Sequence, residues 1–262
     1  MKILISNDDG IHSAGLKFLA AKLCENHEVY VIAPDRERSA AGHSLTLHRP
    51  LRVDKVDMGV SVAQAWETTG TPGDCVKIGI NSILEENQKP DLIISGINYG
   101  PNLGSDILYS GTVSAAMEGA VLGFPSIAVS LFGEGHFLDS DFIYSAEFIS
   151  KFLNNIVQIN FPKKTILNIN IPAVSAEEIT GIQITRLGTR MYTDTYEKRL
   201  DPRGKTYYWM AGEFLKAEQE DGTDIMAIRN NKISITPVTF EMTHKSIMPE
   251  LEQAFCKGLC EL

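Results

Sequence analysis

Two adjacent carboxylates, Asp8 and Asp9, follow the apolar run KILIS and precede Gly10. Neighbouring residues of a regular strand point to opposite faces, so both can face one site only where the strand ends and the chain turns at the glycine. Two carboxylates held so close repel each other unless a cation lies beside them. The pair therefore indicates a divalent metal site. The alternative is that one aspartate caps a helix beginning near Ser13 while the other is solvated.

Two uncharged oxygen donors stand in comparable places further along the chain. Ser39 lies in APDRERSA after a second apolar run, and Asn98 lies in SGIN after a third. Oxygen-only sites favour hard cations such as Mg²⁺ or Mn²⁺ over zinc. Each residue also has a structural alternative, since Ser39 is placed to cap a helix from Ala40 and Asn98 to form a local turn.

A second chemical signal is the turn Ser110, Gly111 and Thr112, which precedes a stretch rich in small residues. Hydroxyls and backbone N–H groups at a helix N-terminus form a cradle for phosphate. The turn is not a Walker loop, because GxxxxGK[ST] is absent. The capping pattern SxxE is absent too, which favours ligand binding over capping alone.

Short apolar strands alternating with helices must position these loops. Strands are expected at residues 2–6, 29–34, 90–96, 125–131 and 165–172, and helices at 13–25, 71–85 and 111–123. This alternation predicts an α/β fold with three layers, in which a mostly parallel sheet has helices on both faces. Ligands of such sheets bind beyond the carboxyl ends of the strands, where the three polar loops fall.

The character of the chain changes near residue 180. The stretch from 184 to 210 is rich in Thr, Tyr and Arg and contains the turn DPRG, so a protruding β-hairpin is expected, with a terminal helix from His244. We expect one continuous domain, made of a metal- and phosphate-binding core at 1–180 and an excursion for oligomerisation at 181–262. The aromatics Tyr207, Tyr208 and Trp209 fit a subunit interface better than a nucleobase stack.

Composition limits the class of protein. The 262 residues are 44% hydrophobic and carry a net charge of −9, which fits one large core and disfavours binding to nucleic-acid polymers or anionic membranes. Four cysteines without CxxC spacing suit reduced thiols better than disulfides. No apolar run reaches a membrane span and no signal peptide is evident, so a cytoplasmic protein is expected.

Long segments of the chain closely resemble the SurE (survival protein E) family of divalent-metal-dependent nucleoside 5'-phosphate phosphatases. They are ILISNDDG, APDRERSAAGHSLT, TGTPGDCVKIGI, SGINYGPNLGSDILYSGTVSAAMEG and DPRGKTYYWMAG. The resemblance implies a Rossmann-like core and one metal ion, Mg²⁺ or Mn²⁺, held by Asp8, Asp9, Ser39 and Asn98. It also implies a homodimer or homotetramer, and activity on nucleoside 5'-monophosphates, with 3'-nucleotides or short polyphosphate accepted by some members. One departure is Asn230 to Lys232, where the family usually carries a glycine and an aromatic.

The mechanistic hypothesis places the phosphoryl group at the metal, with its remaining oxygens held by Asn102, Ser110, Gly111 and Thr112. Water attacks with Asp8 as base, or Asp8 attacks as a nucleophile; Asp8 and Asp9 are the catalytic candidates. The DxD of haloacid-dehalogenase-type phosphatases and the GxSxG elbow of serine hydrolases are both absent. His12 and His43 are weaker candidates for an acid. A nucleotide sensor without turnover and a general acid phosphatase are the alternatives.

Overall fold

The computed structural model describes residues 1–262 except 134, 194, 213, 216–219 and 257–262. In the described part of the chain, nine strands form one sheet in the order β3-β4-β2-β1-β5-β6-β7-β13-β8. Six neighbouring strands run parallel, namely β4 (Gln64–Thr68), β2 (Glu28–Pro34), β1 (Lys2–Ser6), β5 (Leu92–Asn98), β6 (Ser126–Phe132) and β7 (Thr165–Pro172). Their carboxyl ends therefore meet at one edge of the sheet.

The margins of the sheet break the parallel pattern. β3 (Val53–Lys55) pairs antiparallel with β4, and β13 (Lys232–Thr239) pairs antiparallel with β7. β8 (Gly181–Ile184) lies beyond β13 and runs parallel to it. The expectation of a mostly parallel sheet is thus confirmed.

Helices cover both faces because the central strands are apolar on both sides, as in β5, where Leu92 to Ile97 are buried. α1 (Ala14–Leu23) and α4 (Asp139–Val157) pack together over one face, and α2 (Pro72–Ile78) and α3 (Gly111–Val121) over the other. Thr71 caps α2: its hydroxyl accepts from the Asp74 backbone N–H, and Asp74 accepts in return from the Thr71 N–H. A π-helical turn, Gly79–Ile83, follows α2, and single 3-10 turns occupy Glu86–Gln88 and Gly104–Leu108.

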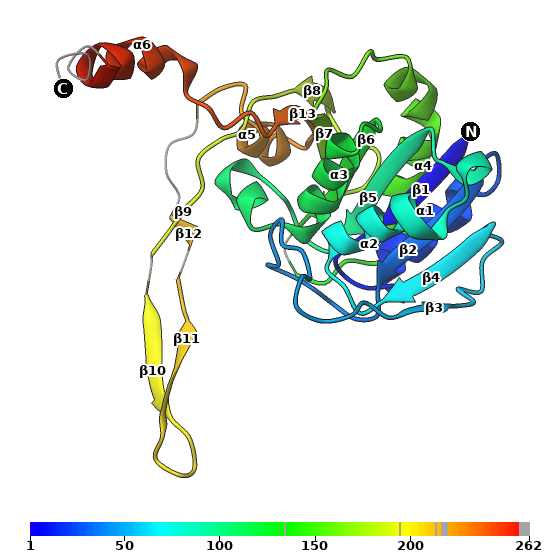
Figure 1. Ribbon diagram of the computed structural model, residues 1–262, viewed down its shortest axis with the longest axis horizontal. Coiled ribbons are helices and arrows are strands. Elements are labelled where there is room, and N and C mark those ends of the chain that lie inside the picture. The colour runs from blue at the N-terminus through cyan, green and yellow to red at the C-terminus, as the bar shows by residue number, and fades with distance from the viewer. Residues whose placement is uncertain (134, 194, 213, 216–219, 257–262) are drawn as a thin grey trace.

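The excursion stands clear of the α/β body (Figure 1). β10 (Tyr196–Leu200) and β11 (Thr206–Met210) form an antiparallel hairpin around the predicted DPRG turn. β9 (Met191–Tyr192) and β12 (Phe214–Leu215) pair between this hairpin and the α/β body (Figure 1). The chain then returns to the sheet through α5 (Asp224–Arg229) and β13 before the terminal segment begins.

The terminal segment is helical, as expected, but in short pieces: a 3-10 turn at Lys245–Ile247, α6 (Met248–Leu251) and a π-helical turn at Glu252–Cys256. β8 and α5 were not predicted, because each is short and lies in the region expected to form one excursion. The family's usual glycine before β13 is replaced without difficulty, because Asn231 takes the left-handed conformation at φ 54°, which asparagine tolerates.

Candidate metal centre

The sheet brings the polar loops after β1 and β5 together. The two strands are neighbours with Ser6 opposite Ser95, so Asp8 and Asp9 leave the sheet beside Asn98, the last residue of β5. The loop after β2 joins them, because the Arg38 backbone N–H donates to the Asp8 carbonyl at 2.7 Å. Ser39 follows directly. The predicted ligands thus come from three adjacent strand ends.

Asn7 shapes the turn that carries the aspartates. Its amide donates to the Gly10 carbonyl at 3.0 Å and to the Ser13 hydroxyl at 2.7 Å, and its side-chain oxygen accepts from the Gly10 N–H at 3.2 Å. Gly10 has φ +96°, and a Cβ there would lie 3.0 Å from the backbone of Arg36. Sequence reasoning missed Asn7, although an asparagine three residues before a glycine is a signal for a turn closed by its side chain.

Asp8 is 4% exposed and faces the N-terminus of α3. The Thr112 hydroxyl donates to its Oδ1 at 2.5 Å, and Gly111 leaves it room, since a Cβ there would lie 2.7 Å from the Asp8 Cβ. Burial raises the pKa of Asp8, while the Thr112 hydroxyl and the backbone N–H groups of Thr112 and Gly111 work to lower it. Burial prevails, so this carboxylate is short of compensating positive charge.

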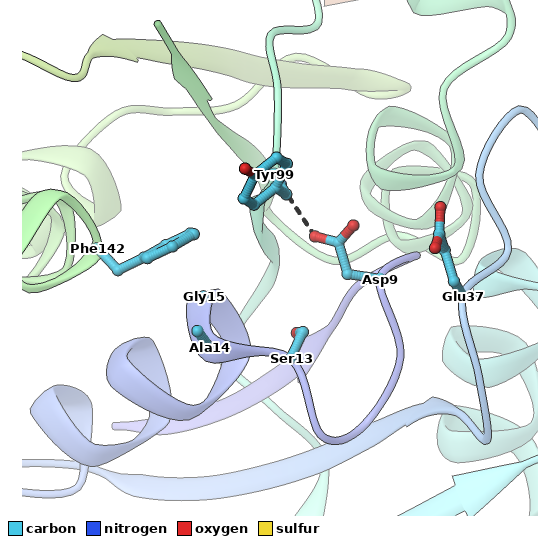
Figure 2. A pocket seen from close by; sticks show the side chains of 7 residues that line it. All are labelled: Asp9, Ser13, Ala14, Gly15, Glu37, Tyr99 and Phe142. Carbon is cyan, nitrogen blue, oxygen red and sulfur yellow. Dashed lines mark hydrogen bonds between the residues drawn. The ribbon is translucent and has the colours of Figure 1, made fainter. Parts of the chain in front are cut away.

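Asp9 points the other way, into a cavity of about 210 Å³ (Figure 2). Its Oδ2 accepts from the Tyr99 backbone N–H at 2.9 Å. Burial, followed by the charge of Asp8, raises the pKa of Asp9 to about 6. Neither aspartate caps α1, whose N-cap residue is Ser13, so the capping alternative for this pair is wrong.

Ser39 and Asn98 differ in how firmly they are held. Ser39 is exposed, and its hydroxyl donates to Glu37 at 2.6 Å. No helix begins at Ala40, which takes φ 55°, so the capping alternative for Ser39 is wrong as well. The Asn98 amide nitrogen donates to the Gly100 carbonyl at 2.7 Å, which makes the local turn considered from sequence. This bond does not use the side-chain oxygen, the atom that would bind a metal.

The donor set fits a hard divalent cation. Among the residues that the structure describes, His, Cys, Asp and Glu nowhere gather in groups of three or more that could hold a metal ion, so the two aspartates need other oxygen donors beside them. Two carboxylates with a hydroxyl and an amide oxygen are ligands that Mg²⁺ and Mn²⁺ prefer. A cation beside two crowded carboxylates removes the cost of ionising both. The raised pKa values of Asp8 and Asp9 therefore also favour a cation at this site.

The predicted phosphate-binding residues have structural partners. The Ser110 hydroxyl accepts from the Val113 N–H at 3.0 Å and caps α3, a role that the absence of the SxxE pattern had disfavoured. Thr112 serves Asp8. The Asn102 amide donates to Ser130 at 2.8 Å. Direct contact of Asn102, Ser110, Gly111 and Thr112 with substrate stays a prediction.

The two histidines considered as acids differ in their surroundings. His43 Nε2 lies 2.9 Å from Glu118, a buried carboxylate on α3 that also accepts from Lys77 at 2.6 Å. This triad ties the loop that carries Ser39 to α2 and α3. His12 is exposed. His43 therefore has a structural role that the sequence did not reveal.

Comparison with known proteins agrees with this geometry. The family model described as "Survival protein SurE" matches residues 3–194, about three quarters of the chain. The chain belongs to the SurE family. Two relatives named "5'-nucleotidase SurE", from Thermosynechococcus vestitus and Moorella thermoacetica, are 49% and 48% identical to it. The matches cover 97% of this chain and 96% of the first relative, and 96% of this chain and 95% of the second.

A solved structure extends the SurE comparison to the fold. The crystal structure of the Sure protein from Aquifex aeolicus is 43% identical and superposes with a TM-score of 0.81, covering 96% of this chain and 98% of that one. Among the described residues, no helix is both long enough and apolar enough to cross a bilayer.

Proposed function

We propose that this chain is a divalent-metal-dependent phosphatase that hydrolyses nucleoside 5'-monophosphates to nucleoside and phosphate. Its family and the name 5'-nucleotidase carried by its relatives support this reaction. The observation that carries the proposal is the adjacent pair Asp8 and Asp9 at the strand ends, with Asp8 buried, Asp9 partly buried, and the pKa of each raised. A protein that only bound anionic nucleotides would gain nothing from carboxylates there.

The metal would be held by Asp8, Asp9, Ser39 and Asn98. When bound, a divalent cation supplies charge stabilisation to the phosphoryl oxygens and lowers the pKa of water. The chain's own groups orient these ligands: Thr112 and the α3 N-terminus fix Asp8, and the Tyr99 N–H fixes Asp9. Ser110, Gly111, Thr112 and Asn102 remain our proposed contacts for phosphate, with their backbone N–H groups as the more accessible donors where the side chains have partners.

Asp8 is our proposed base, since burial leaves it with a raised pKa. The competing role is direct attack on phosphorus to form an aspartyl-phosphate. Both of its oxygens lie close to α3, one bonded to Thr112 and the other where a side chain at Gly111 would collide. This confinement limits the contact of Asp8 with phosphorus and with water alike, so the choice between the two roles stays a prediction.

Oligomerisation and location complete the proposal. The hairpin exposes Tyr208 and Trp209 by about 60% each, which suits an interface between subunits of a homodimer or homotetramer. We propose a cytoplasmic enzyme that acts on small nucleotides, with 3'-nucleotides and short polyphosphate as secondary substrates. No nucleic-acid or membrane partner is part of the proposal.

The test is phosphate release from a panel of nucleoside 5'-monophosphates, 3'-nucleotides and tripolyphosphate. Chain stripped with EDTA is assayed before and after addition of Mg²⁺ or Mn²⁺. We expect release to depend on metal and to be fastest with 5'-monophosphates. Nucleotide binding with no release under either metal would support the sensor alternative, and equal rates on unrelated phosphate esters would support a general phosphatase.

A further inference from the structure

The cavity beside Asp9 has a polar side and an aromatic side. Asp9, Glu37 and Ser13 line one part of it, and Tyr99 and Phe142 line another. In Figure 2 the Asp9 carboxylate lies between Tyr99 and Glu37, while Phe142 projects from α4 into the same space. A compartment of this kind suits a ligand that is polar at one end and flat and apolar at the other.

The closed side of the site determines where the organic part of a substrate can lie. Asp8 is 4% exposed and is covered by Thr112 and Gly111 at the start of α3. Asp9 opens on the cavity instead. A phosphate ester bound at the two aspartates must therefore direct its alcohol away from α3, toward Tyr99.

Tyr99 is held in place at both ends. Its backbone N–H donates to Asp9, so the residue is fixed beside a proposed metal ligand. Its ring packs edge-to-face on Phe137 at 4.6 Å and lies 6.4 Å from the ring of Phe142, and its hydroxyl lies 3.3 Å from His136 Nδ1. The side chain is nevertheless 48% exposed. A large aromatic surface thus stays open although the ring is already ordered, so little conformational entropy is lost on binding.

We propose that Tyr99, supported by Phe137 and Phe142, is the platform on which the nucleobase stacks and that it determines the preference for nucleosides over other phosphate esters. This rests on the proposed function, because it assumes a nucleotide whose phosphate lies at Asp8 and Asp9. Stacking of one base on an aromatic side chain contributes about 1–3 kcal/mol, which corresponds to roughly a fivefold to hundredfold change in affinity. The contact is tolerant of base identity, since every base has a flat face.

The test compares Tyr99→Ala with Tyr99→Phe and wild type. Both variants keep the backbone N–H that orients Asp9, and Tyr99→Phe also keeps the ring, so it is the matched control. Kinetics are measured with AMP and with ribose 5-phosphate, which has the same ester but no base. We expect Tyr99→Ala to raise the KM for AMP roughly fivefold to hundredfold, to leave ribose 5-phosphate unchanged, and Tyr99→Phe to behave like wild type.

An unchanged KM for AMP in Tyr99→Ala would overturn the inference, as would an equal loss on both esters, which would mean that the ring only supports Asp9. Calorimetric titration with adenosine, which lacks phosphate, gives a readout independent of turnover. We expect Tyr99→Ala to weaken adenosine binding and Tyr99→Phe to preserve it. A wild-type chain inactive on every ester would defeat the proposed function, and the adenosine titration would still decide whether Tyr99 holds a base.

Discussion

The strand-end loops and the excursion differ in which side chains they bury and which they expose. Around Asp8, polar side chains are buried: Asn7, Asn102 and Thr112 are at most 6% exposed, and each has a hydrogen-bond partner. On the β10–β11 hairpin, apolar side chains are exposed, with Met210 at 75%. Buried polar groups are costly unless they are paired, and exposed apolar groups are costly unless they are covered. We therefore expect the first region to bind a ligand and the second to pack against another protein surface.

The largest effect is expected for Asp8→Asn, which removes a proposed metal ligand from the strand-end loops with little change in shape. We expect phosphate release from AMP to fall about 10³-fold. Folding should be preserved, because the change also removes a buried charge that is short of compensation. Steady-state rates and thermal unfolding are measured together. Asp54→Asn, on the exposed edge strand β3, is the matched control and should retain full activity.

A second prediction concerns the link between the two regions. Asp224 is fully buried and accepts backbone N–H groups from Gly104 at 2.7 Å, Gly188 at 2.7 Å and Ile225 at 2.9 Å. It thus joins the loop before α3 to the root of the excursion. Asp224→Ala leaves these donors unpaired, and we expect a loss of about 2–4 kcal/mol in the free energy of unfolding, measured in urea.

The control for Asp224 is Asp221→Ala, a neighbouring exposed carboxylate. We expect a change within about 0.5 kcal/mol for that variant. Equal stability of the two variants would show that the loop before α3 does not depend on the C-terminal half of the chain. The excursion would then be an independent attachment.

The hairpin provides a third prediction. Trp209→Ser should weaken subunit association by about 2 kcal/mol, because exposed aromatics are the residues that anchor interfaces. The monomer's own folding should be unaffected, since the side chain is 59% exposed within one chain. Sedimentation velocity across a dilution series measures both the oligomer size and its midpoint. An unchanged assembly would count against an interface role for this face of the hairpin.

The fourth and smallest effect is expected at Glu118. Hydrogen bonds from His43, and then Lys77, hold the pKa of this buried carboxyl below its ordinary value of 4.5. A carboxyl whose pKa is lowered by folding stabilises the folded state above its ordinary pKa, and that contribution is lost as the pH falls through the lower folded value. Glu118→Gln should therefore cost about 1–2 kcal/mol at pH 7, a modest figure because both partners are partly exposed.

The difference in stability between wild type and Glu118→Gln should shrink as the pH falls below about 4.5. Urea unfolding at pH 7, 5 and 4 measures it, with the exposed Glu177→Gln as control. A difference that does not depend on pH would mean that the charge of Glu118 is not what stabilises the loop carrying Ser39.

The sequence predicted the fold wherever hydrophobic periodicity was strong. The runs that form β1, β5 and β7 are apolar enough to be buried on both faces, and Thr71 with Pro72 marked the start of α2. β8 and α5 were not predicted, because four and six residues are too few to show a hydrophobic periodicity. The alternation of strands and helices predicted that the loops carrying Asp8, Asp9, Ser39 and Asn98 lie at one edge of the sheet, and the neighbouring strands β2, β1 and β5 place them there.

What the sequence could not supply were the partners of those residues. The bond from Thr112 to Asp8 spans 104 positions and the pair of His43 with Glu118 spans 75, and no local pattern encodes either. No sequence pattern marked Tyr99 as a ligand-binding residue, because only the packing of residues 97–142 shows that its ring borders the same cavity as Asp9. Local motifs identified the chemistry, and tertiary contacts assigned each group its role.

The central claim is that one divalent cation, held by Asp8 and Asp9, is required for hydrolysis of the phosphate ester. The most direct measurement is a Mn²⁺ titration of metal-stripped chain, with binding followed by the electron paramagnetic resonance of free Mn²⁺ and AMP hydrolysis followed in the same samples. The account predicts that binding and turnover rise together to one equivalent in wild type and that both are lost in Asp8→Asn. Turnover without metal, or Mn²⁺ binding that Asp8→Asn leaves intact, would contradict it.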